Sequence, residues 1–297
     1  MGIDRLPAWS THSYERVGES ASRVLIAVTD ARCHADDRTF VVVQGFQSWI
    51  ESFEMQRFQL IAHGLRARLI IVEVPGFGVA GSRLLRNERR GLLAGDFRPL
   101  AERMFEAAGS IVTDTDRDEP LSFLGYSMGA SIATAMTNVA VAQGWSAEEL
   151  VLVEPVALQR WKLRELISAT RREDRWTTAY TAANEGVEGA AAPWDQRPGV
   201  RPPTKRRVDL LLLGAALRHG GLAADLLAGA GPRRVIVVRG DRSALSGAAY
   251  FPILARLRQR GIATAELTVP GHHAFWHSLA AVHDMTSRLA ALLDTSN

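Results

Sequence analysis

The chain has 297 residues, of which 47% are hydrophobic and 23% are charged, and its formal net charge is only +3. This balance is typical of a globular protein with a sizeable core, and it excludes a disordered chain, a collagen-like repeat and a coiled coil. Because 35 basic residues are nearly cancelled by 32 acidic ones, the charge gives no reason to expect a nucleic-acid partner. The single cysteine, Cys33, excludes an intramolecular disulfide framework.

We expect a cytoplasmic location. The first residues contain no apolar core of signal-peptide length, and a single cysteine suits a reducing compartment. The longest apolar stretches, near residues 210–217 and 235–238, are shorter than the roughly 20 residues that a helix needs to cross a bilayer. We therefore expect no membrane span.

Short β-branched runs alternate along the chain with longer helix-like segments, which is the pattern of βαβ units. Several of the runs are continuously apolar, as strands covered on both faces should be. The expected strands are residues 24–28, 40–43, 69–74, 121–124, 150–153, 235–239 and 265–269. The expected helices are residues 49–63, 97–108, 128–143, 157–171, 250–260 and 275–293. The sequence therefore predicts an α/β fold with a mostly parallel central sheet flanked by helices.

The alternation breaks between the fifth and sixth expected strands. The intervening segment of about 80 residues is too long for one crossover helix. It contains prolines, glycines, an apolar run near residues 210–213 and the tryptophans Trp161, Trp176 and Trp194. We therefore predict one α/β core formed by residues 1–155 and 233–297, with residues 156–232 inserted as a helical cap or lid.

The string GYSMG, from Gly125 to Gly129, matches the pattern G-x-S-x-G. An apolar run precedes it and a helix-like segment follows it, which is the strand–turn–helix context of a nucleophile elbow. A serine on such a strained turn leaves no room for side chains two positions to either side, and glycine meets that steric demand. Ser127 is therefore the candidate nucleophile.

Four blocks, in this order, resemble the α/β-hydrolase fold family over nearly the whole chain. They are VVVQGFQSW, IIVEVPGFGVAGS, the string around Ser127 and VPGHHAFWHSLAAVHDMTSRLAALL. Gln44 stands where the family often has His, and Glu73 stands where Asp is common. The resemblance implies an α/β-hydrolase fold and an esterase-like serine hydrolase with a Ser-His-acid catalytic triad.

A serine hydroxyl becomes a good nucleophile when a base within hydrogen-bond reach takes its proton. The family's chain order of serine, acid and histidine implies that this base follows the last strand. In the family a glycine precedes the histidine, and Gly271-His272 fits that turn. His272 is therefore the favoured general base, and His273 is the alternative.

The acid is where the sequence departs from the family's pattern. After the strand at residues 235–239 the family commonly shows G-x-x-D, but residues 240–243 read GDRS, with serine in the acid's position. Asp241 lies in the same loop, two residues early, and is the favoured acid. Glu154, directly after the strand at residues 150–153, is the alternative, and a site without an acid is a third reading.

The remaining site residues are expected near the same edge of the sheet. The backbone N–H groups of Phe46 and Met128 are the expected donors of an oxyanion hole. The expected substrate pocket comprises Gln47, Trp49, Phe77 and Trp276. No group of His, Cys, Asp and Glu has the spacing of a metal site and no nucleotide-binding motif is present, so we expect neither metal nor cofactor.

Together these features predict a hydrolase that cleaves a carboxylic ester or related acyl bond of a small, apolar molecule through an acyl-enzyme at Ser127. A thioesterase or a C–C bond hydrolase on the same site is the alternative among enzymes. A non-catalytic protein of this fold that binds a small ligand is the alternative outside them. The sequence leaves the oligomeric state open.

Overall fold

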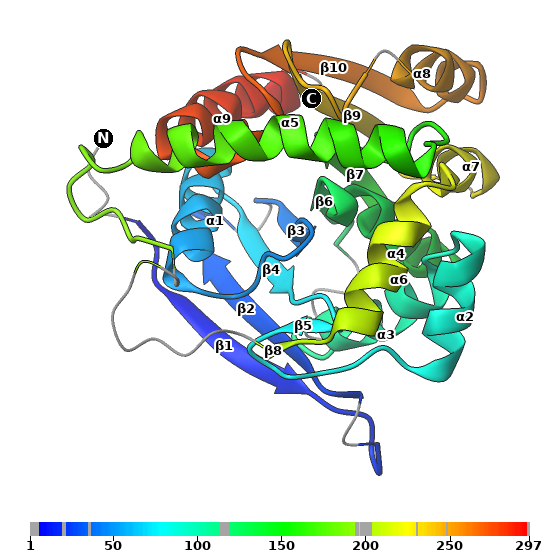
Figure 1. Cartoon of the computed structure of the whole chain (residues 1–297). Coiled ribbons are helices and arrows are strands. Elements are labelled where there is room, and N and C mark those ends of the chain that lie inside the picture. The colour runs from blue at the N-terminus through cyan, green and yellow to red at the C-terminus, as the bar shows by residue number, and fades with distance from the viewer. Residues whose placement is uncertain are drawn as a thin grey trace.

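The computed structural model describes residues 6–19, 22–34, 37–112, 119–193, 196, 204–229, 231–247 and 249–295. In this part of the chain, eight strands form one sheet in the order β1-β2-β4-β3-β6-β7-β9-β10 (Figure 1). Within this sheet only the pairs β1–β2 and β2–β4 are antiparallel. The strands are β1 (Trp9–Tyr14), β2 (Val24–Asp30), β3 (Thr39–Val43), β4 (Arg68–Val72), β6 (Leu121–Tyr126), β7 (Ala147–Val153), β9 (Arg234–Gly240) and β10 (Ala263–Val269).

Every strand expected from the sequence corresponds to a strand of this sheet, but β1 was not expected. Strand β1 lies at the edge of the sheet and pairs with β2 alone. Its sequence, WSTHSY, leaves four central residues exposed and carries no apolar alternation. Backbone pairing therefore makes it a strand, without the side-chain signal on which the prediction depended.

The central strands are buried on both faces because successive side chains enter different hydrophobic clusters. In β3, Val41 and Val43 belong to one cluster, and Phe40 and Val42 belong to the other. Helices α1 (Ser52–Leu65) and α9 (Leu279–Asp294) pack against each other and cover the second cluster.

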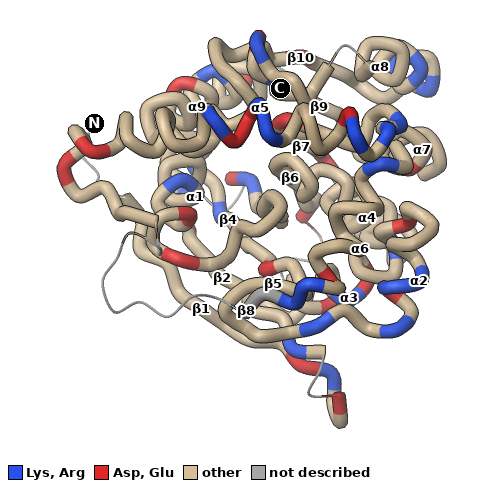
Figure 2. Tube along the Cα trace, viewed as in Figure 1, with Lys and Arg blue, Asp and Glu red and all other residues tan. Residues whose placement is uncertain are grey.

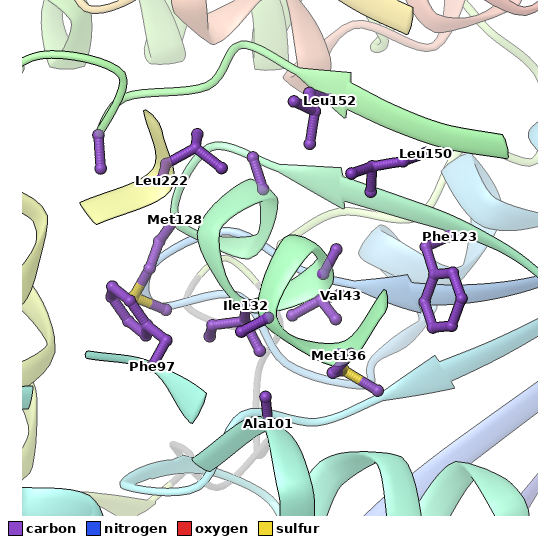
Figure 3. Packing of buried hydrophobic residues seen from close by; sticks show 14 of the residues in the cluster. Val43, Phe97, Ala101, Phe123, Met128, Ile132, Met136, Leu150, Leu152 and Leu222 are labelled. Atoms are coloured by element: carbon purple, nitrogen blue, oxygen red, sulfur yellow. The ribbon is translucent and has the colours of Figure 1, made fainter. Parts of the chain in front are cut away.

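The opposite face of the sheet is covered by α3 (Arg98–Gly109), α4 (Met128–Ala142) and α8 (Tyr250–Gln259). Figure 3 shows Ile132 and Met136 of α4 packed with Val43 of β3 and Ala101 of α3. Helix α2 (Arg86–Ala94) adds Leu92 to the same cluster. These layers fix the start of α4, and therefore Ser127, at the carboxyl end of β6.

The segment between β7 and β9 contains α5 (Leu163–Ala182), β8 (Thr204–Lys205), α6 (Arg207–Leu217) and α7 (Gly221–Ala228). Strand β8 pairs with the short strand β5 (Phe77–Gly78). Helix α6 packs against α2, and α7 packs against α4 and α8. The end of this segment therefore joins the helices on the same face of the sheet as α3, α4 and α8. Helix α5 begins at Leu163 rather than near residue 157 and contacts the short 3-10 helix η5 (His273–His277). Trp194 lies outside the described residues.

Among the residues described, no single helix is both long enough and apolar enough to cross a bilayer. Helices α6 and α7 meet that criterion only when they are counted together, and the pair is bent by 67°.

Candidate active site

Ser127 occupies a strained turn between β6 and α4. Its backbone has φ +56° and ψ −116°, and its N–H donates to the carbonyl of Val153 at 2.8 Å. A Cβ atom on Gly125 would lie 2.3 Å from the carbonyl oxygen of Gly129, and one on Gly129 would lie 2.2 Å from that of Val43. Both glycines are therefore required for the turn, as the sequence pattern predicted, and the turn fixes where the Ser127 hydroxyl lies.

The side chain next to Ser127 is His273. Its Nε2 atom lies 2.9 Å from the Ser127 hydroxyl oxygen, and both residues are more than nine-tenths buried. Tyr126 supports the histidine from the other side: the two rings stack with centroids 5.4 Å apart, and the Tyr126 hydroxyl donates to the His273 carbonyl at 3.1 Å. The imidazole is thus held in one orientation at the serine.

Glu154 completes a second hydrogen bond to the imidazole. Its Oε2 atom lies 2.8 Å from the Nδ1 atom of His273, and the residue is fully buried. The carboxylate also accepts the backbone N–H of Gly240 and the hydroxyl of Ser243. Glu154 has φ +52°, a left-handed conformation that is unusual for glutamate. Such a conformation persists only where the surroundings enforce it, and here it places the carboxylate beside the histidine.

The structure does not bring the favoured residues, His272 and Asp241, to Ser127; it places the two alternatives, His273 and Glu154, there instead. The His272 ring stacks on Trp176, with centroids 4.0 Å apart and planes 11° apart, while its neighbour His273 faces Ser127. The one-residue difference arises at Gly271, whose φ of +143° turns the chain so that the second histidine points inward.

Asp241 is exposed, and it does not reach the imidazole. Its carboxylate accepts the backbone N–H of Gly271 at 2.8 Å and lies 3.5 Å from the guanidinium of Arg242. The bond from Gly271 is the main reason why the pKa of Asp241 lies below its usual value. Asp241 therefore fastens the turn before the histidines, whereas Ser243, in the position where the family commonly has its acid, donates to Glu154.

The expected oxyanion donors lie on two segments that meet at the serine. Met128 begins α4, and Phe46 follows Gly45, where a Cβ atom would lie 2.8 Å from the Tyr126 ring and 3.5 Å from the Ser127 Cβ. The loop after β3 is therefore close to the elbow. Gln44 in this loop is buried, and neither atom of its amide group has a hydrogen-bond partner among the described residues. The donor role of the two N–H groups remains a prediction.

Two of the four expected pocket residues line a cavity of about 430 Å³. Gln47 and Trp49 form part of its wall together with Phe46, and α5 contributes Thr177 and Thr181. The wall is more polar than expected, because it also includes the carboxyl groups of Glu51, Glu54 and Glu185.

The other two expected pocket residues are buried in the packing around the site. Phe77 packs edge-on against Phe46, with ring centroids 6.1 Å apart. Trp276 stacks on Tyr126, with centroids 4.6 Å apart. They support the walls of the site and do not line the cavity.

Helix α5 holds the segment that carries His273, a feature that sequence reasoning missed. Glu173 accepts the backbone N–H of His273 at 2.9 Å, and the Tyr180 hydroxyl accepts that of His272 at 3.1 Å. Just beyond α5, Asn184 donates to the carbonyl of His277 and accepts the N–H of Leu279, both at 2.8 Å. No sequence motif marked these polar residues, because their partners are backbone groups more than ninety residues away.

Within the described residues, no group of three or more His, Cys, Asp and Glu side chains is arranged to hold a metal ion.

No family model matches this sequence, and no curated protein matches it. Solved structures do resemble it. A thioesterase domain from the curacin biosynthetic pathway is 16% identical with a TM-score of 0.56, over 97% of this chain and 100% of that one. An arylesterase is 18% identical with a TM-score of 0.58, over 98% and 85% of the two chains. A hyperthermophilic esterase from the archaeon Pyrobaculum calidifontis is 14% identical with a TM-score of 0.58, over 99% and 88%.

Identities this low establish the architecture alone. The strand order, the mostly parallel sheet with helices on both faces, and the serine turn between β6 and α4 agree with that likeness over nearly the full length of the chain. The chain has the α/β-hydrolase fold.

Proposed function

We propose that this protein is a serine hydrolase that cleaves carboxylic esters or related acyl bonds, thioesters included. The observation that carries the proposal is the buried relay from the Ser127 hydroxyl to His273 and on to Glu154, with bonds of 2.9 and 2.8 Å. Nucleophile, base and orienting acid in this geometry define the chemistry of acyl transfer. The proposal is also supported by the solved structures of similar fold, which include esterases and a thioesterase domain.

The first step forms the acyl-enzyme. The Ser127 hydroxyl attacks the carbonyl carbon while His273 takes its proton, and the carbonyl electrons move onto the oxygen. Glu154 accepts the Nδ1–H of His273, which keeps Nε2 free to act as the base and stabilises the imidazolium. The N–H groups of Met128 and Phe46 donate to the developing oxyanion. The tetrahedral intermediate then expels the alcohol or thiol, which takes the proton from His273.

The second step releases the acid. A water molecule gives a proton to His273 as its oxygen attacks the acyl carbon, and a second tetrahedral intermediate forms. Its collapse breaks the bond to the Ser127 oxygen, which recovers a proton from His273. The products are a carboxylic acid and the free enzyme, so no cofactor takes part.

The cavity of about 430 Å³ at Gln47 and Trp49 is the proposed place for one part of the substrate. The support for this placement is the loop that carries Phe46, which forms part of the cavity's wall and also supplies one of the proposed oxyanion donors. The insertion at residues 156–232 contributes the opposite wall through α5. We propose that this insertion acts as a cap that selects substrates.

The decisive experiment is labelling with a fluorophosphonate, which reacts with activated serines. We expect stoichiometric labelling of the wild-type protein, together with hydrolysis of p-nitrophenyl butyrate. Ser127→Ala abolishes both, whereas the matched control Ser131→Ala, at a buried serine one turn into α4, retains both. A folded wild-type protein that neither labels nor hydrolyses the ester would instead indicate a ligand-binding member of the fold.

A further inference from the structure

A second cavity, with a volume of about 370 Å³, lies between α5 and the turns that carry Arg242 and His272. One wall consists of Trp176 stacked flat on the His272 ring. The described residues that line it are Arg172, Glu173, Arg175, Trp176, Arg242, Ala244 and His272. The cavity therefore adjoins the histidine segment but is separate from the one at Gln47 and Trp49.

Arginine is the most frequent residue type around this second cavity. Three arginines, Arg172, Arg175 and Arg242, are among its lining residues, and Glu173 is the sole carboxylate among those described. Both oxygens of Glu173 already accept backbone N–H groups, one from His273 and one from Ala244. The carboxylate is thus occupied in holding the loops, and it does not pair with the arginines.

The arginines themselves are open to a ligand. Arg172 and Arg175 are exposed and make no ion pair with any other residue that the structure describes. Arg242 lies 3.5 Å from Asp241, but both side chains are at least half exposed, and exposed pairs of this kind contribute little. Arg164 and Arg171 extend the same basic face toward the start of α5, where Figure 2 shows several Lys and Arg positions.

We infer that this cavity binds an anionic group, a phosphate or a carboxylate. Guanidinium groups present planar pairs of N–H donors that match the oxygens of both anions, and charge-assisted bonds of this kind are strong. Because His272 adjoins His273, the anion would lie next to the segment that carries the proposed general base.

The anion has two sources that share this chemistry: a free ion, or a charged group of the substrate. The second source rests on the proposed hydrolase function, whereas binding of a free ion does not. The test compares wild type with Arg172→Gln/Arg175→Gln, and a control, Arg86→Gln/Arg90→Gln, removes the same charge from exposed positions of α2.

The first arm measures binding of inorganic phosphate by isothermal titration calorimetry at low ionic strength. The second arm measures kcat/KM for p-nitrophenyl hemisuccinate relative to p-nitrophenyl butyrate, which differ by a carboxylate in place of a methyl group. The neutral ester reports whether the fold and the triad survive each substitution, so the ratio isolates the effect of charge. Added sodium chloride lowers both signals if the contact is electrostatic.

If the cavity binds a free anion, wild type binds phosphate and Arg172→Gln/Arg175→Gln weakens the affinity at least about tenfold. The control variant should keep the wild-type affinity. A substrate subsite gives a hemisuccinate preference that Arg172→Gln/Arg175→Gln lowers by about that factor. Either result supports the inference. Equal phosphate binding and equal ester ratios in all three proteins would overturn it, and would leave the arginines as a solvated face of α5. The proposed function fails separately, through loss of butyrate hydrolysis and of Ser127 labelling in wild type.

Discussion

The carboxylate of Glu173 accepts the backbone N–H of His273 at 2.9 Å. Glu173 belongs to α5, whereas His273 follows the last strand of the sheet, so this bond joins the segment between β7 and β9 to the proposed general base. The second oxygen of Glu173 accepts the N–H of Ala244, next to the Ser243 that donates to Glu154. One buried side chain thus holds both loops that meet at the proposed triad, and we expect Glu173 to act as a positioning residue.

We predict that Glu173→Gln lowers kcat/KM by about ten- to a hundredfold, because displacing a catalytic group by even about 1 Å is costly. The amide would place an NH₂ group against one of the two backbone N–H donors. Because Glu173 holds the proposed base and not the substrate, kcat should fall while KM stays near the wild-type value. Initial rates over a range of p-nitrophenyl butyrate concentrations measure both constants.

The control is Glu165→Gln, an exposed carboxylate of the same helix that pairs with Lys162 at 3.7 Å. It should leave both kcat and KM near wild type. A Glu173 variant that loses thermal stability but keeps the wild-type kcat would mean that this residue serves the fold only.

A second prediction concerns the acid. Glu154→Gln lowers kcat by at least about a hundredfold, because an amide can donate to Nδ1 and so favour the wrong imidazole tautomer. Asp241→Asn costs less than about tenfold, because this exposed side chain only fastens the turn at Gly271. Steady-state kinetics of the two variants decide between the acids, and the reverse order would return the role to Asp241.

The third prediction moves the acid within the same site. The Ser243 hydroxyl donates to the Glu154 oxygen that faces His273. A carboxylate at residue 243 would therefore lie close to the same imidazole. Glu154→Ala combined with Ser243→Asp should recover at least about tenfold of the activity that Glu154→Ala alone loses. Ser246→Asp, in the same loop, is the matched control and should recover nothing.

The two adjacent histidines give a fourth prediction. His273→Gln removes the base and should lower kcat about as far as Ser127→Ala does, since residues that act as a unit lose activity together. His272→Phe preserves a flat ring against Trp176 and should retain kcat on a neutral ester within about fivefold. Comparable losses in both variants would show that the proton transfer does not depend on His273 alone.

A fifth prediction concerns stability and pH. Burial, and then the neighbouring charge of Asp96, raises the pKa of Asp225 from 3.8 to about 6. Between these two values the folded protein binds more protons than the unfolded chain, so stability falls as the pH rises through that window. Above about pH 6 the ionised carboxylate of Asp225 destabilises the folded protein, and substitution by asparagine removes this charge.

Asp225→Asn should therefore raise the Tm at pH 8 by about 2–4 °C, and the gain should vanish at about pH 3, below both pKa values, where Asp225 is neutral in the folded and the unfolded chain. Differential scanning calorimetry at the two pH values measures it. Glu102→Gln, at an exposed position of α3, serves as the control and should leave the Tm unchanged at both. An equal gain at the acidic pH would point to packing or helix propensity as the cause.

The sheet was predictable from the sequence because its inner strands must be apolar on both faces. β3, with all five residues buried, shows that signal in its purest form. Strand β1 was not predicted because its exposed side chains show no apolar alternation, and its conformation depends on pairing with β2. Helix α2 was missed for a related reason: it is short, it buries only Glu88 and Leu92, and its first turns are mostly charged.

The serine turn was predictable because glycine spacing reports a backbone constraint directly. The histidine that lies beside Ser127 was not, since the choice between His272 and His273 depends on the φ angle of Gly271, which no neighbouring residue type reveals. The position of Glu154 had a usable signal: Ser243 stands where the family commonly has its acid, and a glutamate directly follows β7. That pattern favours a carboxylate on the strand next to β6, where the structure places Glu154 beside His273.

The bonds from α5 to the histidine segment restrict how a substrate could enter. A swinging lid opens by rotating away from the site, but rotation of α5 would strip acceptors from the N–H groups of His272 and His273 and unstack Trp176. Such an opening would disturb the segment that carries the proposed general base. We therefore expect α5 to stay in place during turnover and the substrate to enter beside it, so that the space next to the helix, and not a hinge, limits which molecules react.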